Sequence, residues 1–167
     1  MAQTEHFIHS DEIDPIDIVE TVAHQYEWDF DRVADDQIAM VVEGQWRSYS
    51  LTLAWSARDE VLRLICTFDM DPPAEREGDL FELLNLTNDQ VWDGSFTFWT
   101  EQRLMVWRYG LVLNGESLAS PEQINRMIRS AIENAERYYP SFQLVCWGDT
   151  EPSAALDIAM AEAYGRA

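Results

Sequence analysis

Apolar and polar residues alternate in several short stretches of the chain, a pattern typical of β-strands that bury one face. The alternation is clearest in 46–55, where large apolar side chains take every second position and small ones lie between. The two sets are Tyr49, Leu51, Leu53 and Trp55, and Ser48, Ser50, Thr52 and Ala54. Strands are also predicted at 37–43, 61–70, 95–99 and 104–113. Short connections between the first three strands indicate an antiparallel meander.

Four other segments carry the signals of α-helices. Asp14 and Pro15 suit the first positions of a helix over 15–26, and a second helix follows Pro73. The sequence Ser120-Pro121-Glu122-Gln123 is a capping box that begins the longest helix, which Pro140 is expected to end. An alanine-rich helix over 152–164 closes the chain.

Two stretches between these elements are predicted to be irregular or extended. Residues 28–36 are interpreted as a connection, and 142–147 as a short strand or extended segment. The predicted fold class is therefore α+β, with an antiparallel five- to six-stranded sheet flanked by helices. With no internal repeat or linker, the prediction is a flexible acidic tail over 1–13 and a single domain over 14–167.

The charge balance excludes several classes of partner. Eleven basic residues against 31 acidic ones give a net charge of −20, and all eleven are arginines. A chain without a basic stripe is a poor ligand for nucleic acid or for an anionic membrane surface. The first residues lack the pattern of a signal peptide, so the expected location is the cytoplasm. Cys66 and Cys146 lie in apolar runs and are predicted to be buried free thiols.

Catalytic motifs are absent from the sequence, so no enzymatic activity and no cofactor are expected. Without lysine there is no Schiff-base chemistry, and no G-x-S-x-G or phosphate-binding glycine loop occurs. A carboxylate pair of the glycosidase kind leaves no local motif and stays open. His6 and His9 in the tail, and the acidic stretch 69–82, are interpreted as incidental composition and as capping or solvated carboxylates rather than as metal sites.

A candidate contact surface follows from the strand alternation. The face opposite Tyr49, Leu51 and Leu53 is predicted to carry small hydroxyl side chains together with an aromatic residue and two arginines. Its predicted members are Ser48, Ser50, Thr52, Arg63, Thr67, Thr97, Trp99 and Arg108. Arg63, Trp99 and Arg108 are the candidate protein-contact residues, because aromatic and arginine side chains are enriched at interfaces. The alternative is an ordinary solvated sheet face.

Four segments resemble the YbjN family of bacterial proteins. They are DPIDIVE (14–20), GQWRSYSLTLAW (44–55), LLNLTNDQVWDGSFTFW (83–99) and ERYYPSFQLVCWG (136–148). The most specific motifs are N-D-x-x-W-x-G-x-F and Y-P-x-F-Q, and neither is a catalytic signature. The resemblance covers about residues 14–164. It implies a fold similar to type III secretion chaperones, often dimeric, and a role as a regulator in sensory transduction without enzymatic activity.

Two hypotheses of function follow. The first is a non-enzymatic protein-binding or regulatory domain of chaperone-like kind, which binds a partner protein or itself as a homodimer. The second is a sensor domain that binds a small molecule or carbohydrate in a pocket lined by tryptophan and carboxylates.

Overall fold

The computed structural model describes residues 13–115 and 117–165, and an antiparallel sheet of six strands forms its centre. The strand order is β1-β2-β3-β4-β6-β5, so β1 and β5 lie at the two edges. The strands are β1 (Asp29–Ala34), β2 (Gln37–Glu43), β3 (Ser48–Ser56), β4 (Val61–Asp69), β5 (Ser95–Trp99) and β6 (Leu104–Val112). The predicted meander and the α+β class with an antiparallel sheet are confirmed.

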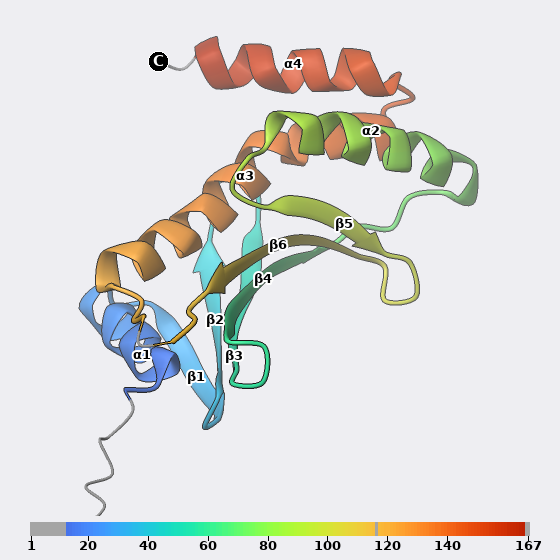
Figure 1. The fold of residues 1–167 in the computed structure, drawn as a ribbon. Helices are drawn as coiled ribbons and strands as arrows, with labels where there is room; N and C mark the ends of the chain where they lie inside the picture. Colours follow the sequence, from blue (N-terminus) through green and yellow to red (C-terminus); the bar gives the residue numbers. More distant parts are fainter. Residues whose placement is uncertain (1–12, 116, 166–167) are drawn as a thin grey trace, which may run out of the picture.

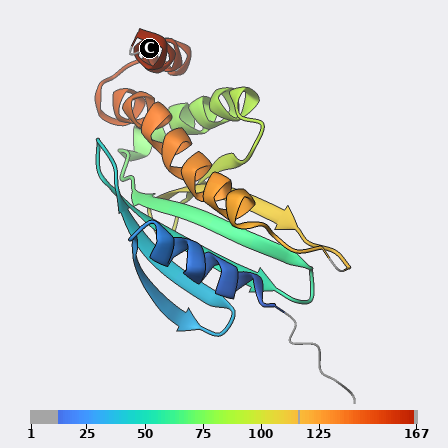
Figure 2. The ribbon, with the colours of Figure 1, turned by 90° about the vertical axis from the view of Figure 1, so that its left-hand side faces the viewer.

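The helices gather on one side of this sheet. They are α1 (Pro15–Gln25), α2 (Glu77–Gln90), α3 (Pro121–Trp147) and α4 (Pro152–Gly165), and a short 3-10 turn, η1 (Ala74–Arg76), precedes α2. In Figure 1, α1 and α3 lie along the sheet, and α4 forms an outer layer over α2 and α3. The turned view in Figure 2 shows α1 and α3 in front of the strands. Within the described residues, no helix covers the opposite face of the sheet (Figure 1).

The helix starts follow the local signals in the sequence. The Asp14 carboxylate accepts a hydrogen bond from the Ile16 amide at 2.9 Å, so it caps α1. At the start of α3 the Ser120 hydroxyl accepts from the Gln123 amide at 3.1 Å, and the Gln123 side chain accepts from the Ser120 amide at 2.9 Å. These two bonds form the predicted capping box.

The core lies between the helices and the sheet face that the alternation predicted. Tyr49, Leu51 and Leu53 are fully buried, and by register Leu51 and Leu53 lie opposite Cys66 and Leu64. From the helix side, α1 and α3 contribute the buried apolar stripes Ile16, Val19, Val22 and Ala23, and Ile124, Met127, Ile128, Ala131 and Ala135.

The segment 28–36 was predicted to be a connection, and this is wrong because Asp29–Ala34 forms the edge strand β1. Its alternation is hard to see because a charged residue takes an inward position. Arg32 points toward α1, where its guanidinium pairs with Asp17 at 3.0 Å and Glu20 at 2.9 Å. Only Phe30 supplies a large apolar side chain on that face, where its ring meets His24 edge to face.

The predicted end of the longest helix at Pro140 is also wrong, because α3 continues through Pro140 to Trp147. The prediction of a short strand or extended segment at 142–147 is wrong for the same reason, since these residues belong to α3. A proline inside a helix removes one backbone hydrogen bond and costs about 3 kcal/mol. The segment beyond it keeps the helical spacing of apolar residues and buries Phe142, Val145 and Cys146. Each fully buried side chain of this size contributes roughly 1.5–3 kcal/mol, which offsets the cost of the proline.

The N-D-x-x-W-x-G-x-F motif connects α2 to β5. The Asn88 side-chain amide donates to the Phe96 carbonyl at 2.9 Å, and its oxygen accepts from the Phe96 amide at 2.7 Å. A Cβ atom at Gly94 would lie 2.3 Å from the buried Trp107 ring, so only glycine fits there. The motif is therefore structural, except that Trp92 is 97% exposed.

Candidate functional site

The open face is the name we give to the sheet surface opposite the helices, formed by the outward side chains of β1 to β6. The strand register places all three candidate contact residues on it. Arg108 lies opposite Ile65 of β4 and Ser95 of β5, and Trp99 lies opposite Leu104 of β6. Arg63 lies opposite Ala54 and Gly110 on its two neighbouring strands. Their positions match the sequence prediction, and their role as contact residues stays a prediction.

The open face combines small side chains at its centre with exposed apolar side chains farther out. Ser50, Thr52 and Ala54 of β3 occupy the middle of the sheet. Val41 on β2 is 49% exposed and Val112 on β6 is 62% exposed. Small side chains let a second layer approach closely, and exposed apolar ones favour its presence.

Acidic and basic side chains both lie on the open face. Its acidic members are Asp29 and Asp31 on β1, Glu43 on β2 and Asp69 on β4. Its basic members are Arg63 on β4 and Arg108 on β6. Arg63 pairs with Asp59. Among the described residues, the side chains of Asp29, Asp31 and Arg108 form no ion pair or hydrogen bond with one another or with other groups. These three side chains are therefore available to a partner.

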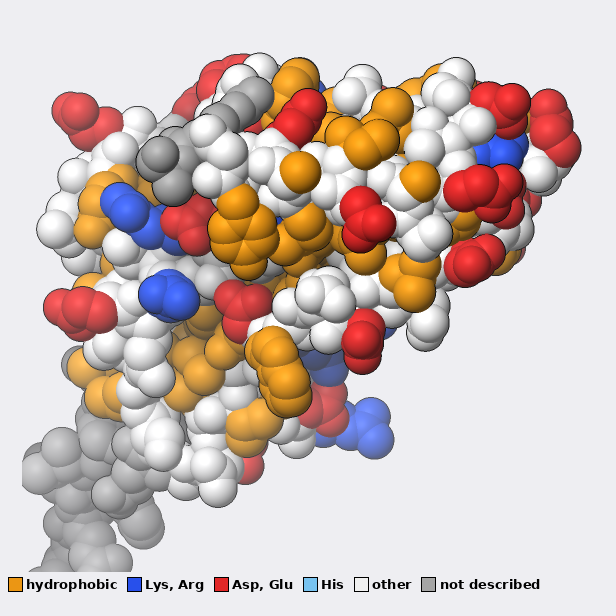
Figure 3. All heavy atoms as spheres, turned by 90° about the horizontal axis from the view of Figure 1, so that it is seen from above, with side chains coloured by type: hydrophobic (Ala, Val, Ile, Leu, Met, Phe, Trp, Pro, Cys, Tyr) orange, Lys and Arg blue, Asp and Glu red, His pale blue; other side chains and the backbone are white. Residues whose placement is uncertain are grey.

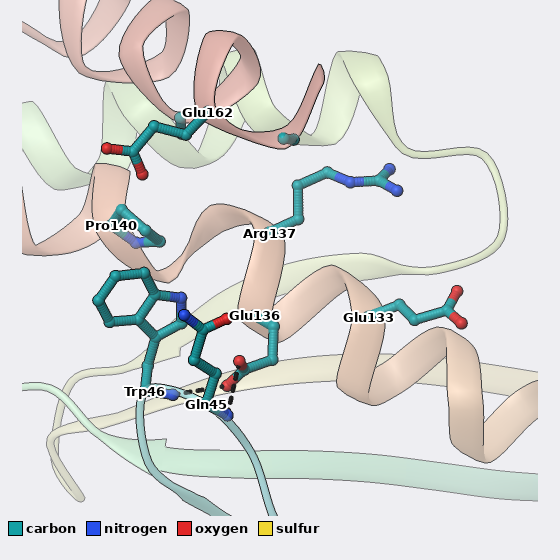
Figure 4. A pocket seen from close by; sticks show the side chains of 9 residues that line it. Gln45, Trp46, Glu133, Glu136, Arg137, Pro140 and Glu162 are labelled. Atoms are coloured by element: carbon teal, nitrogen blue, oxygen red, sulfur yellow. Dashed lines mark hydrogen bonds between the residues drawn. The ribbon is translucent and has the colours of Figure 1, made fainter. Parts of the chain in front are cut away.

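A second candidate site is a groove on the outer side of α3, which we call the α3–α4 groove. It consists of two adjoining hollows of about 270 Å³ and 470 Å³ that share Trp46, Pro140 and Glu162. The other lining residues are Gln45, Glu133, Glu136, Arg137, Gln143, Leu144, Trp147, Gly148, Ile158, Ala159 and Ala163. In Figure 4, the Trp46 indole lies beside Pro140, and Glu162 reaches toward both from α4.

One carboxylate of the groove holds the β2–β3 turn against α3. Glu136 accepts hydrogen bonds from the Gln45 amide at 2.8 Å, the Trp46 amide at 3.3 Å and the Tyr49 hydroxyl at 2.5 Å (Figure 4). Burial raises the pKa of the Tyr49 phenol well above its usual value, and the bond to Glu136 raises it further. A Cβ atom at Gly44 would lie 2.3 Å from a Glu136 oxygen, so glycine is required at this contact. Glu136 therefore has a structural role in the groove.

The acidic stretch 69–82 is neutralised in part by arginines. Arg103 pairs with Glu77, and with Asp71 at 2.9 Å. Arg76 pairs with Asp79 at 2.7 Å and donates to the Val145 and Thr150 carbonyls, both at 2.8 Å. Residues 13–115 and 117–165 contain no group of three or more His, Cys, Asp or Glu side chains that could hold a metal ion. Arginines thus pair with Asp71, Glu77 and Asp79, which belong to the stretch interpreted as capping or solvated carboxylates.

The histidines and cysteines add no candidate chemistry among the described residues. His24 packs against Phe30, while His6 and His9 lie outside the described residues. Cys66 and Cys146 are buried free thiols, as predicted. Burial raises the pKa of each thiol to about 12, so both stay protonated at neutral pH.

The helix side of the molecule has a mixed surface. Figure 3 shows apolar side chains over α4 and α2 with acidic side chains around them and few basic ones. Exposed apolar residues of these helices are Phe81, Ile158 and Tyr164. None of the helices in the described part of the chain has the length and apolar content needed to cross a membrane.

Comparisons with known proteins agree with the fold. A crystal structure described as "YbjN, a putative transcription regulator from E. coli" has a TM-score of 0.50 and 10% sequence identity, covering 90% of this chain and 93% of that one. No curated protein matched the sequence. The model of the YbjN family, described as "Putative bacterial sensory transduction regulator", matches residues 15–144, most of the chain. The chain belongs to the YbjN family.

Proposed function

We propose that this protein is a non-enzymatic regulator that acts by binding protein through the open face of its sheet. The observation that carries the proposal is an uncovered sheet face with exposed valines at its sides and an arginine, Arg108, that has no ion-pair partner among the described residues. Trp99 and Arg63 lie on the same face. Arginine and tryptophan side chains contribute most strongly to binding when a partner removes them from water. The family description, a regulator, supports a binding role.

The test compares the double variant Trp99→Ala/Arg108→Ala with a matched control away from the open face. Trp92→Ala/Arg129→Ala removes the same two side-chain types, from the exposed Trp92 after α2 and from the exposed Arg129 on α3. Molar mass is measured by light scattering, and captured proteins are compared in pull-downs from bacterial lysate. We expect self-association or protein capture to fall about tenfold or more for the open-face variant only. Unchanged mass and unchanged capture would contradict the proposal.

The finer suggestion of a chaperone-like role rests on the resemblance in fold alone. We propose that the open face holds an apolar segment of a partly unfolded partner. Suppression of aggregation of a heat-denatured model protein tests this. The wild type should suppress aggregation more than Trp99→Ala/Arg108→Ala does, and equal suppression would contradict the suggestion.

A second candidate function is a sensor that binds a small molecule or carbohydrate in the α3–α4 groove. It is favoured by the Trp46 side chain and the Glu162 carboxylate, which line the same hollow on either side of Pro140. Pockets for polar ligands combine an aromatic surface with a few oriented polar groups. Glu136 accepts hydrogen bonds from the β2–β3 turn and from Tyr49. Glu133 and Glu162 are therefore the acidic groups of the groove that can bind a ligand. A ligand that raises the melting temperature of the wild type but not of Trp46→Ala would support this function.

A further inference from the structure

The free edge is the name we give to residues 109–112 of β6, which pair with another strand on one side only. The pairing of β5 with β6 stops at Ser95 opposite Arg108, whereas β4 pairs with β6 as far as Val112. In Figure 1, β5 accordingly runs along only part of β6. A further strand in line with β5 would complete the pairing of β6.

The backbone groups of Gly110 and Val112 point out of the free edge. In an antiparallel sheet, alternate residues of a strand direct their N–H and C=O groups to alternate neighbours. The Leu113 amide donates to the Glu60 carbonyl at 2.8 Å, on the side of β4. Gly110 and Val112 have the opposite parity, so their groups point away from β4. In the part of the chain that the structure describes, these four backbone groups have no hydrogen-bond partner.

The other edges of the sheet are less open to an added strand. On β5, the Phe96 amide and carbonyl point away from β6 and bond to the Asn88 side chain at 2.7 Å and 2.9 Å. Strand β1 carries Asp29, Asp31 and Arg32, and charged residues on an edge strand discourage pairing. The free edge has the sequence Tyr-Gly-Leu-Val, with no charge and no proline. It is therefore the edge best suited to pair with another chain.

A hollow of about 330 Å³ lies beside the free edge, between β6 and the first turns of α3, and we call it the β6–α3 hollow. Its apolar lining residues are Tyr109, Leu111 and Met127, and its charged ones are Asp93, Glu122 and Arg126. The Tyr109 ring stacks on the buried Trp107 ring with centroids 6.0 Å apart, which fixes one wall. Tyr109 and Leu111 belong to the free edge, so the inward side chains of a strand added there would enter the hollow.

The charges of the β6–α3 hollow favour a basic side chain. Neither Asp93 nor Glu122 forms an ion pair within the described residues, and Asp93 accepts one hydrogen bond, from Asn134 at 3.4 Å. Arg126 balances one of the two carboxylates, so one negative charge is in excess. The net charge of −20 adds to this preference at longer range. A lysine or arginine can pack its aliphatic stem on Leu111 and Met127 and direct its charged end to the carboxylates.

We propose that the free edge and the β6–α3 hollow bind an extended, basic segment of a partner protein, which joins the sheet as an antiparallel strand in line with β5. Gly110 and Val112 each exchange two hydrogen bonds with alternate residues of the segment. A lysine or arginine between those two residues enters the hollow, because side chains alternate between the faces of a sheet. The site is separate from the proposed binding by the open face and does not rest on it.

A defined peptide tests the backbone pairing. The probe is acetyl-Gly-Thr-Val-Lys-Val-Thr-Gly-amide, titrated into the full chain while its amide resonances are followed by NMR. We expect the Gly110 and Val112 resonances to shift and saturate. N-methylation of both valines removes the N–H groups that face β6 and should raise the dissociation constant about tenfold or more. N-methylation of the lysine amide, which faces away from β6, should change the constant by less than about threefold.

Two variants of the chain test the position of the site. Val112→Pro removes an N–H that faces away from β4, so the pairing with β4 is kept, and it should weaken peptide binding about tenfold. Asp93→Asn/Glu122→Gln removes both carboxylates and should weaken binding about fivefold. The matched control Glu133→Gln/Asp157→Asn makes the same charge change at exposed positions of α3 and α4, and it should leave binding unchanged.

Three results would overturn the inference. The first is the absence of shifts at Gly110 and Val112 at millimolar peptide. The second is an equal effect of the two N-methylated peptides, which excludes antiparallel backbone pairing. The third is a shift of these resonances with rising protein concentration alone, which assigns the free edge to a second copy. The proposed function is tested separately by Trp99→Ala/Arg108→Ala, so each can fail without the other.

Discussion

The contact of Glu136 with the β2–β3 turn gives the sharpest stability prediction. Replacing Glu136 by alanine removes the acceptor of the Tyr49 hydroxyl and of two backbone amides, those of Gln45 and Trp46. The Tyr49 side chain is fully buried, so its hydroxyl has little chance to bond water after the change. Gln45 and Trp46 are exposed, and water can replace the lost acceptor at their amides.

The magnitude follows from these contacts. A hydrogen bond to a charged group contributes about 1.5–3 kcal/mol, and the two exposed amides add about 0.5 kcal/mol each. We therefore expect Glu136→Ala to lower the free energy of unfolding by about 3 kcal/mol. For a chain of this size each 1 kcal/mol lowers the melting temperature by about 2–4 °C, so the expected shift is roughly 6–12 °C.

Urea denaturation of the wild type and four variants measures the effect and its cause. Glu133→Ala is the matched control, because Glu133 is an exposed glutamate one turn earlier on α3, and it should change stability by less than about 0.5 kcal/mol. Tyr49→Phe and the double variant with Glu136→Ala complete a cycle whose coupling should be about 1–2 kcal/mol. Equal stabilities of Glu136→Ala and Glu133→Ala, or strict additivity in the cycle, would refute this reasoning.

Three further changes test other parts of the structure. Gly44→Ala should lower the free energy of unfolding by about 1–3 kcal/mol through the clash with Glu136, whereas Gly78→Ala, with open space around it, should be neutral or stabilising in thermal melts. Asn88→Ala should cost about 1–3 kcal/mol in urea denaturation, because it leaves the Phe96 backbone without two bonds; a change below 0.5 kcal/mol would contradict its role. The pKa of the Cys66 thiol is raised from 9.0 to about 12, so the unfolded chain loses this proton first and stability falls as pH rises from about 9 toward 12. Each such thiol makes the free energy of unfolding fall by about 1.4 kcal/mol per pH unit in this range. Cys66→Ala should therefore lose stability with pH less steeply than the wild type, and equal slopes would contradict the raised pKa of Cys66.

The sheet could be predicted from the sequence wherever one face buries apolar side chains. Alternation in 46–55 and 61–70 predicts strands that the structure has as β3 and β4, and it assigns Arg63 to the open face. The same rule failed at β1, because Arg32 takes an inward position and is neutralised by carboxylates of α1. The alternation within a strand does not show a contact with the preceding helix, whose carboxylates lie 12 and 15 residues before Arg32.

The second failure has a different cause. Pro140 is a strong local signal for the end of a helix. The buried side chains of Phe142 and Val145, however, lie on the same face of α3 as the buried residues before Pro140. Continuous helical spacing of apolar residues across 138–146 was the signal that could have found the longer helix. Tertiary burial outweighs the local cost of one proline.

The two candidate sites also differ in how far they can be predicted from the sequence. The open face follows from residue parity within strands, so its members could be assigned from the sequence. The α3–α4 groove brings Trp46 of the β2–β3 turn together with Glu162 and Ile158 of α4. Trp46 lies more than a hundred positions before either of them in the sequence. Their proximity depends on α4 packing against α3, which no motif in the chain encodes.

The most direct test of the central claim follows the methyl groups of the protein by NMR as protein concentration rises from micromolar to millimolar. The open-face account predicts that the resonances of Val41, Ile65 and Val112 shift together, since all three lie on that face. Ile158 on α4 is exposed to a similar degree as Val41 and should not move. Shifts confined to Ile158, or an increase in mass with no change at the three open-face residues, would contradict the claim that the open face binds protein.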